Sequence, residues 1–182
     1  MKPAAEAGIT QGSVLEANHL LAGKYRLLRL LGEGGMGAVW EARHELLGTK
    51  VAVKVVHPEL LRRPGLVERF LQEARVSAQI RSPHVVQVVD VDREADGTAF
   101  FVMELLVGRP LSALLEQQRR LPVETVVEYG RQLLDGLEAA HALGVVHRDL
   151  KPENVIVVEG APRPVLKIID FGIAKVRRTD AG

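Results

Sequence analysis

Residues 147–154 are His147-Arg148-Asp149-Leu150-Lys151-Pro152-Glu153-Asn154, which form the pattern H-R-D-L-x-x-x-N in full. Asp149 is able to accept a proton from a hydroxyl nucleophile, and Asn154 offers a side-chain carbonyl oxygen to a hard cation. Further along the chain, Asp170-Phe171-Gly172 follows an apolar run and adds a carboxylate for the same kind of cation. Each piece alone is compatible with an ordinary polar turn. Their order and context together predict a site where a hydroxyl group reacts beside a divalent cation.

Glycines recur near the N-terminus, where residues 32–39 have the sequence GEGGMGAV and match G-x-G-x-x-G-x-V. Glycine lets backbone N–H groups approach a phosphate closely, because no side chain stands between them. An ordinary glycine turn between two strands is the alternative, since this motif alone has low specificity. A dinucleotide-binding loop would open a helix, whereas residues 38–40, Ala-Val-Trp, continue as a strand. No G-x-x-x-x-G-K-[ST] pattern is present either.

Lys54 ends the strand-like run Val51-Ala52-Val53-Lys54. A lysine in this position either lies at the surface or faces a cleft, where it needs an anion. Glu73 lies within about 20° of Leu66 on a helical projection, so it borders the apolar stripe of a predicted helix over 66–80. A carboxylate turned toward a core needs a partner, so we expect Lys54 and Glu73 to pair. The alternative is that both side chains are simply solvated.

The pattern of apolar residues predicts an α+β organisation with a different character in each half. In the first half, period-2 runs and glycine turns predict five strands around the single helix at 66–80: residues 25–31, 38–42, 50–56, 85–91 and 98–103. In the second half, Pro122 and Gly144 bracket a long helix over 123–143. Two short strands follow it, at 155–158 and 165–169. The apolar stripe of the long helix is predicted to contain Val126, Val127, Leu133, Leu134, Leu137 and Ala140.

Composition excludes several classes of protein. Of the 182 residues, 47% are hydrophobic and 26% are charged, with a net charge of +1. This balance is typical of a folded globular chain and gives no field that would attract nucleic acid or an anionic membrane. The longest apolar run, 99–103, is far shorter than the 20 or so residues of a membrane span. The absence of cysteine excludes disulfides and thiol chemistry, and it fits a cytoplasmic protein.

Taken together, these motifs resemble those of a Hanks-type (eukaryotic-like) bacterial protein serine/threonine kinase, and the Gly-Gly-Met-Gly loop is typical of the bacterial members. The resemblance implies a protein-kinase-like fold of class α+β, with a five-stranded antiparallel N-lobe carrying one helix and an incomplete, mainly helical C-lobe. We expect a flexible tail over 1–22, the N-lobe over 23–103 and a partial C-lobe over 104–182. ATP would bind in the cleft between the lobes. Residues 151–154, Lys-Pro-Glu-Asn, resemble the protein kinases more closely than small-molecule kinases of related fold.

The resemblance also implies a role for individual residues. Asp149 would be the catalytic base, and Lys151 would contact the γ-phosphate, as is typical of serine/threonine members. Lys54, paired with Glu73, would hold the α- and β-phosphates, while Asn154 and Asp170 would bind Mg²⁺. The nucleotide would contact Leu31, Gly32, Gly34, Gly35, Gly37, Val39, Ala52, Lys54, Met103, Glu104 and Leu106.

The resemblance ends shortly after the Asp-Phe-Gly motif, because only 10 residues follow Gly172 and Thr179 is the one hydroxyl residue among them. The expectation is therefore a kinase truncated at this point, either a fragment or a naturally short chain. The implied function is transfer of the ATP γ-phosphoryl group to Ser or Thr of protein substrates. The alternative is a non-catalytic ATP-binding fragment or interaction module without the substrate-binding part. The longer protein would be cytoplasmic or tethered to a membrane through segments absent from this chain.

The long helix at 123–143 makes a separate prediction. In the family such a helix is buried by C-lobe helices that come later in the chain. The two short strands predicted after it are able to cover only part of its stripe. We therefore expect an exposed apolar face, which a partner would cover, and an unstable or aggregating chain when it is produced alone.

Overall fold

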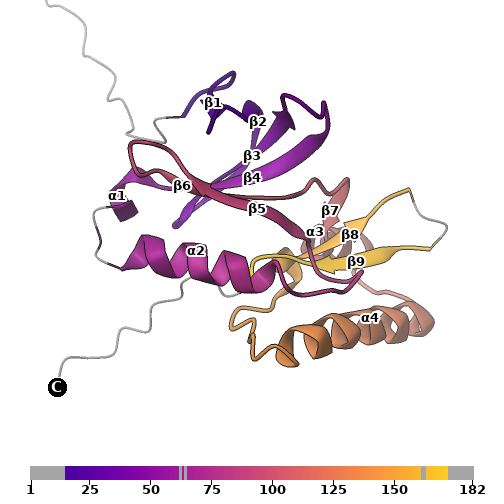
Figure 1. Ribbon diagram of the computed structural model, residues 1–182. Helices are drawn as coiled ribbons and strands as arrows, with labels where there is room; N and C mark the ends of the chain where they lie inside the picture. Colours follow the sequence, from indigo (N-terminus) through magenta and orange to yellow (C-terminus); the bar gives the residue numbers. More distant parts are fainter. Residues whose placement is uncertain (1–14, 62, 64, 161–162, 172–182) are drawn as a thin grey trace, which may run out of the picture.

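The computed structural model describes residues 15–61, 63, 65–160 and 163–171, and for Glu73 it describes the backbone alone. The chain folds into two lobes, an N-lobe up to residue 104 and a C-lobe beyond it (Figure 1). The N-lobe contains one antiparallel sheet in the order β1-β2-β3-β4-β6-β5. Its strands are β1 Leu20–Leu21, β2 Tyr25–Gly34, β3 Gly37–His44, β4 Lys50–Val56, β5 Val88–Arg93 and β6 Ala99–Glu104. Its helices are α1 Pro58–Leu61 and α2 Leu66–Ser77.

Both faces of the central strands are buried, because alternate side chains of a strand point to opposite faces. On one face Trp40, Val53 and Val55 pack with β2 and β6. On the other face Ala52 and Met103 pack against α2. Lys54 lies between Ala52 and Val56 on this second face, so the strand carries its lysine toward the side of the sheet that α2 covers. Two residues of this packing form an aromatic pair, Phe70 of α2 and Phe101 of β6, whose ring centroids lie 5.3 Å apart.

A buried carboxylate on β3 is held by two cations. Glu41 is only 4% exposed, and its two oxygens bind Lys50 Nζ at 2.9 Å and Arg29 Nη2 at 2.7 Å. The hydrogen bond from Lys50 lowers the pKa of Glu41 below its ordinary value of 4.5; burial opposes this shift, and the charge of Arg29 adds to it. The ionised form of Glu41 is therefore part of the folded state.

The C-lobe combines two helices with a small antiparallel sheet in the order β7-β8-β9. Its elements are β7 Gly108–Pro110, α3 Leu111–Gln118, α4 Val123–His141, the 3₁₀ helix η1 Pro152–Asn154, β8 Val155–Val158 and β9 Val165–Ile168. The predicted long helix is confirmed as α4, which begins after Pro122 and is followed by Gly144 at a φ of 73°. Both residues mark the ends of the helix. Proline suits the first turn of a helix, and glycine adopts the left-handed backbone that follows a helix end.

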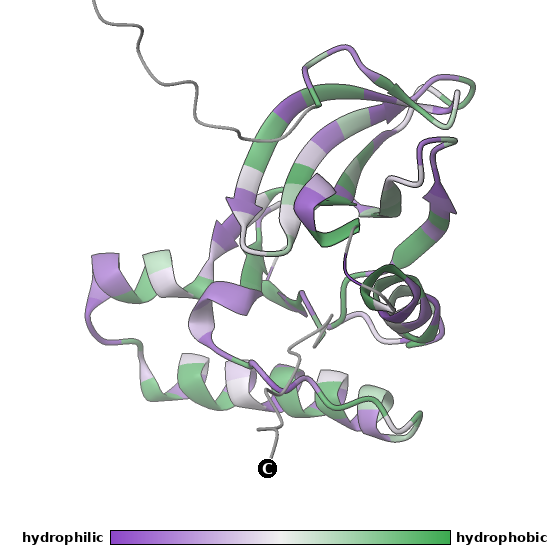
Figure 2. Ribbon diagram, turned by 90° about the vertical axis from the view of Figure 1, so that its left-hand side faces the viewer, coloured by the Kyte–Doolittle hydropathy of each residue, from purple (hydrophilic) through white to green (hydrophobic). Residues whose placement is uncertain are grey.

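One face of α4 packs on the rest of the C-lobe and another faces solvent. The buried positions are Tyr129, Gln132, Gly136 and Ala140. Gly136 allows close packing, because a Cβ there would lie 3.1 Å from both His84 O and Ile168 Cδ1. Several members of the predicted stripe lie outside this contact: Val126, Val127 and Leu134 are 52%, 66% and 68% exposed. Figure 2 shows hydrophobic residues along this helix, the long one at the base of the view. The prediction that α4 is only partly covered is confirmed for the described residues.

The described residues differ from the predicted elements in several places, and one difference is a second N-lobe helix, α1, where a single helix was predicted. The N-lobe sheet has a sixth strand, β1, inside the segment expected to be a tail, because Leu20 and Leu21 pair with Arg26 and Tyr25 and Leu21 is fully buried. The C-lobe contains β7 and α3, which were not predicted. The strand predicted at 85–91 begins instead at Val88.

The residues before Val88 join the two lobes. Val85 forms a parallel bridge with Ile168 of β9. Backbone hydrogen bonds from Val86 N to Ile168 O and from Ile168 N to His84 O, each 2.9 Å long, flank this bridge. We call residues 84–86 and Ile168 the inter-lobe seam. No helix in the described part of the chain is both long enough and apolar enough to cross a membrane.

Candidate active site

His147 organises the loop that carries Asp149. Its imidazole is 2% exposed. Its Nδ1 accepts a hydrogen bond from Asp149 N at 3.3 Å, and its Nε2 lies 2.9 Å from Ile169 O. Because Nδ1 accepts, Nε2 carries the hydrogen and donates to that carbonyl. The ring also packs against Phe171, with 4.8 Å between the centroids. His147 therefore connects the H-R-D loop with the segment that leads into Asp170.

Asn154 ties the same two segments together a second time. Its Nδ2 donates to Asp149 O at 2.9 Å, and its backbone carbonyl accepts from Ile169 N at 2.9 Å. The amide nitrogen is thus used to hold the loop, which leaves the side-chain oxygen as the available acceptor. The prediction placed Asp149, Asn154 and Asp170 in one site, and these contacts bring their backbones together.

The lysine of β4 reaches this site from the other lobe. Lys54 Nζ makes an ion pair with Asp170 Oδ1, and the lysine side chain is 12% exposed against 37% for the aspartate. Lys54 is therefore mostly buried and meets an anion, as one of the two interpretations predicted. The anion in this structure is Asp170, which the sequence assigned to metal binding. The pairing of Lys54 with Glu73 stays a prediction, because the Glu73 side chain lies outside the described residues.

Two residues of the site have left-handed backbones. The φ angles of Arg148 and Asp170 are 61° and 55°. Such angles are uncommon for residues other than glycine and cost free energy, and they concentrate at functional sites where surrounding contacts hold them. Here the contacts of His147 and Asn154 supply that support on either side.

Lys151 lies beside the carboxylate of Asp149. Its Nζ is 3.5 Å from Asp149 Oδ2, and both side chains are partly exposed, at 49% and 32%. The predicted roles of these two residues in phosphate transfer stay predictions. The expected neighbourhood of Asp149 and Lys151 is thus present in the fold.

The glycine motif forms the turn between β2 and β3, with Gly34 paired to Gly37 in the hairpin register. A Cβ on Gly32, Gly34 or Gly35 would meet no atom within 4 Å. Packing therefore does not explain these three glycines, and their predicted contact with phosphate stays a prediction. Gly37 is different, because a Cβ there would collide with Val55 O and lie 2.9 Å from Val55 C. Gly37 is required by the pairing of β3 with β4.

The residues predicted to surround the base of a nucleotide form an apolar surface under the sheet. Ala52 pairs with Met103 in the register of β4 and β6, and Val39 pairs with Lys54. These apolar residues and Leu106 belong to one cluster. Leu31 does not: it is 41% exposed, at a register shift between Leu30 and Gly32.

Two side chains near the site make contacts that were not predicted. Glu104 Oε1 accepts from Gln87 N at 2.8 Å and from Lys167 Nζ at 2.6 Å, so it links β6 to β9 of the other lobe. His57 Nε2 lies 2.7 Å from Gly34 O and contacts the glycine turn. Neither residue belongs to a motif, and a single sequence contains no signal for such long-range partners.

The oxygen donors suit magnesium. Mg²⁺ prefers hard oxygen ligands and is usually held by one or two protein groups together with substrate phosphates. Asp170 and Asn154 provide a carboxylate and a carbonyl oxygen on adjoining segments. The described residues contain no group of three or more His, Asp or Glu that would hold a metal ion alone. The donor set therefore fits a cation shared with a bound phosphate.

Comparison with known proteins agrees with this architecture. PknA, a serine/threonine-protein kinase of Mycobacterium tuberculosis, is 43% identical over 159 residues, which are 85% of this chain and 36% of that protein. Pkn1, a serine/threonine-protein kinase of Myxococcus xanthus, is 44% identical over 155 residues, covering 85% of this chain and 22% of that protein. The chain thus spans less than half the length of both relatives.

The fold is also that of solved kinase structures. The crystal structure of the M. tuberculosis PknI kinase domain matches with a TM-score of 0.75 at 29% identity, over 89% of this chain and 63% of that one. Residues 25–181 match the family model described as protein kinase domain. With the H-R-D loop, the Asp-Phe-Gly aspartate and the β4 lysine brought together between the lobes, this chain belongs to the protein kinase family, in the Hanks-type branch of the bacterial serine/threonine kinases.

Proposed function

We propose that the chain contains the nucleotide and phosphate-transfer site of a serine/threonine protein kinase. The observation that carries this proposal is the ion pair of Lys54 with Asp170, which spans the two lobes beside the loop of Asp149. In a bare cleft these two groups neutralise each other. The family generally uses ATP and Mg²⁺, and with those bound, Lys54 would bind phosphate oxygens while Asp170 and Asn154 hold the cation.

The chemistry follows from the position of each group. Asp149 accepts the proton of a Ser or Thr hydroxyl as its oxygen attacks the γ-phosphorus. The bond from that phosphorus to the β–γ bridging oxygen breaks, and ADP is released. Lys151 offers its positive charge to the phosphoryl oxygens, and the glycine turn supplies backbone N–H donors. Mg²⁺, when bound, neutralises charge on the phosphates.

The alternative function is an ATP-binding interaction module without catalysis. The observation that favours it is the apolar surface of α4, where Val126, Val127 and Leu134 face solvent. Such a surface is a site for a partner or a cause of aggregation. Both functions share the nucleotide site, so nucleotide binding does not distinguish them, whereas phosphate transfer does.

The test separates binding from transfer. Titration calorimetry with Mg·ATP should show saturable binding, and Lys54→Met should weaken it by about tenfold or more, which corresponds to about 1.4 kcal/mol or more. Lys24→Met is the matched control, because Lys24 pairs with Asp92 at the far edge of the sheet and is 46% exposed. No heat at millimolar Mg·ATP, in a sample shown to be folded, would overturn the proposal.

The roles of the two aspartates are tested on the full-length protein that contains this chain. The assay measures transfer of radiolabelled phosphate to a generic basic protein. Asp149→Asn keeps the shape and removes the base, so nucleotide binding should survive while transfer falls by about 10²–10⁴-fold. Asp170→Asn should weaken binding as well, because the carboxylate is a cation ligand. Equal loss of ATP binding in both variants would contradict this division of roles.

A further inference from the structure

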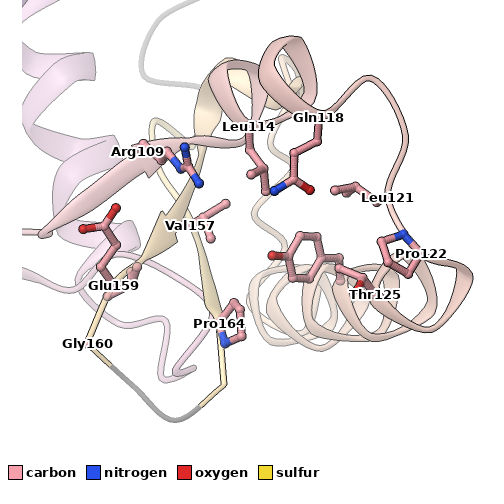
Figure 3. Close-up of a pocket in the computed structure, with 12 residues that line it drawn as sticks. Arg109, Leu114, Gln118, Leu121, Pro122, Thr125, Val157, Glu159, Gly160 and Pro164 are labelled. Atoms are coloured by element: carbon pink, nitrogen blue, oxygen red, sulfur yellow. The ribbon is translucent and has the colours of Figure 1, made fainter.

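A pocket on the side of the C-lobe has a mixed lining that selects no single kind of ligand (Figure 3). It has a volume of about 470 Å³ and lies among β7, β8, α3 and the start of α4. Its charged lining residues are one cation, Arg109, and one carboxylate, Glu159. Charge therefore favours neither an anionic nor a cationic occupant. The contacts around the glycine turn between β2 and β3 are more specific, and they centre on His57.

His57 lies directly after β4, and its backbone is held on both sides. Its backbone N–H donates to Met36 O of the glycine turn at 3.2 Å, and its carbonyl accepts from Leu60 N of α1 at 2.9 Å. Pro58 follows it, and the residue before a proline is restricted to extended backbone angles. The backbone of His57 therefore gives its side chain a defined direction.

The imidazole of His57 reaches the glycine turn. Its Nε2 lies 2.7 Å from Gly34 O. Because a carbonyl oxygen only accepts hydrogen bonds, Nε2 carries the hydrogen and donates it. Glu33 Oε1 lies 3.8 Å from the same nitrogen, which is too far for a hydrogen bond. The side chain is 21% exposed, so protein atoms surround most of it, and its hydrogen bond is made to the backbone of the turn.

The turn has little packing of its own at this point. A Cβ on Gly34 or Gly35 would meet no atom within 4 Å, and glycine has more backbone freedom than any other residue. Local packing therefore does little to orient the peptide between these two glycines. The hydrogen bond from His57 supplies a constraint that the turn lacks.

A hydrogen bond to Gly34 O also sets the direction of the next N–H group. The described peptide bonds are all trans, and in a planar trans peptide the C=O and the following N–H point in opposite directions. Alternation along β4 places His57 on the face of the sheet opposite to Lys54, and His57 lines a small pocket there with Val55. The Gly35 N–H therefore points away from His57, toward the face that carries Lys54.

We propose that His57 is a positioning residue that turns the Gly35 N–H toward the phosphates of a bound nucleotide. This inference rests on the proposed function, because it needs the glycine turn to lie over those phosphates. Hydrogen bonds to charged oxygens are stronger than those between neutral groups, and a donor that is oriented before the ligand arrives loses less entropy on binding. His57 contacts no nucleotide itself and acts through the turn.

The experiment compares variants of His57 in the full-length protein that contains this chain. His57→Phe keeps a flat ring and removes the donor, so it should weaken Mg·ATP binding in titration calorimetry by about three- to tenfold. His57→Leu, a second variant without a donor, should do the same. His57→Gln places an amide N–H at a similar reach and should bind Mg·ATP within about twofold of the wild type.

Adenosine separates positioning over phosphate from a general effect on the nucleotide site. It has no phosphate, so its affinity should stay within about twofold of the wild type in all three variants, since the lost hydrogen bond acts on phosphate alone. The affinity for adenosine is obtained by displacing it with Mg·ATP in the calorimeter. Circular dichroism checks that each variant melts as the wild type does.

His44→Phe is the matched control, because His44 also ends a strand and contacts the adjoining turn. Its Nδ1 accepts from Leu46 N at 3.3 Å and from Leu47 N at 3.4 Å. It lies at the opposite end of β3 from the glycine turn. This variant loses a comparable turn contact and should bind both Mg·ATP and adenosine within about twofold of the wild type.

Two results would overturn the inference while the proposed function stands. The first is binding of Mg·ATP by the two donor-free variants within about twofold of the wild type. The second is an equal loss of Mg·ATP and adenosine affinity, or a loss that His57→Gln does not restore, which would make His57 a general structural residue. Absence of Mg·ATP binding by the wild type would instead overturn the proposed function, and this inference with it.

Discussion

Gly37 and Gly34 belong to one glycine motif, but the structure gives them different roles, which alanine substitutions should separate. A Cβ on Gly37 would collide with Val55 O and lie 2.9 Å from Val55 C and 3.2 Å from Val56 Cα. Ordinary contact begins at 3.4 Å, so β3 would have to move away from β4. Overpacking of this kind costs about 1–3 kcal/mol, and a strained hydrogen bond at the strand end adds about 1 kcal/mol. We expect Gly37→Ala to destabilise the chain by about 2–4 kcal/mol.

For a chain of this size, 1 kcal/mol corresponds to about 2–4 °C in melting temperature. Gly37→Ala should therefore melt about 4–16 °C lower when unfolding is followed by circular dichroism. Gly34→Ala is the matched control for stability, because its Cβ would meet no atom within 4 Å, and its melting temperature should stay within about 2 °C of the wild type. Gly34→Ala should instead weaken Mg·ATP binding in calorimetry. Unchanged melting of Gly37→Ala, or a large drop for Gly34→Ala, would refute this assignment.

Three further outcomes are expected. Glu41→Gln should destabilise the fold at pH 7 by about 1–3 kcal/mol. Because the folded-state pKa of Glu41 lies below its ordinary value of 4.5, the difference in stability between the two proteins should shrink as the pH falls below 4.5. Urea unfolding at pH 7 and pH 3 measures this difference. Glu104→Gln and Lys167→Met should each lower Mg·ATP affinity about threefold. The double variant should lose no more, because each single variant already removes the same Lys167–Glu104 contact. Additive losses would contradict this coupling. Val126→Ser with Val127→Ser should reduce aggregation in light scattering and leave the melting temperature unchanged, because both valines are more than half exposed.

Sequence reasoning succeeded where the signal was local. The bounds of β4 and β8 match the predicted strands at 50–56 and 155–158. The start of α4 follows from Pro122, because the proline ring fixes the backbone angle φ and removes an N–H donor, which suits the beginning of a helix. The sequence does not predict the helix α3, although Leu111, Leu114 and Leu115 have helical spacing. Eight residues after a proline gave too short a window for a periodic signal.

The remaining differences depend on partners far along the chain. Val85 and Val86 look like the start of a strand, but their hydrogen-bond partner is Ile168 of the other lobe. Leu20 and Leu21 form too short a run to predict β1, which exists because β2 offers its edge. The predicted site residues rest on motifs that fix residue types at given spacings, and their roles stay predictions. The contact of Lys54 with Asp170 and the bridge through Glu104 needed the tertiary structure.

The inter-lobe seam also has a consequence for how the molecule moves and unfolds. Covalent continuity between the lobes runs through residues 105–107, while residues 84–86 add a hydrogen-bonded second attachment to β9. A rigid body attached along a line at two points rotates about that line, so the lobes would move apart by a twist about this axis, which would also break the ion pair of Lys54 with Asp170. The same double attachment opposes independent melting of either lobe. The two lobes should therefore unfold as one cooperative unit. A substitution that destabilises β9 should also destabilise the sheet that contains Lys54.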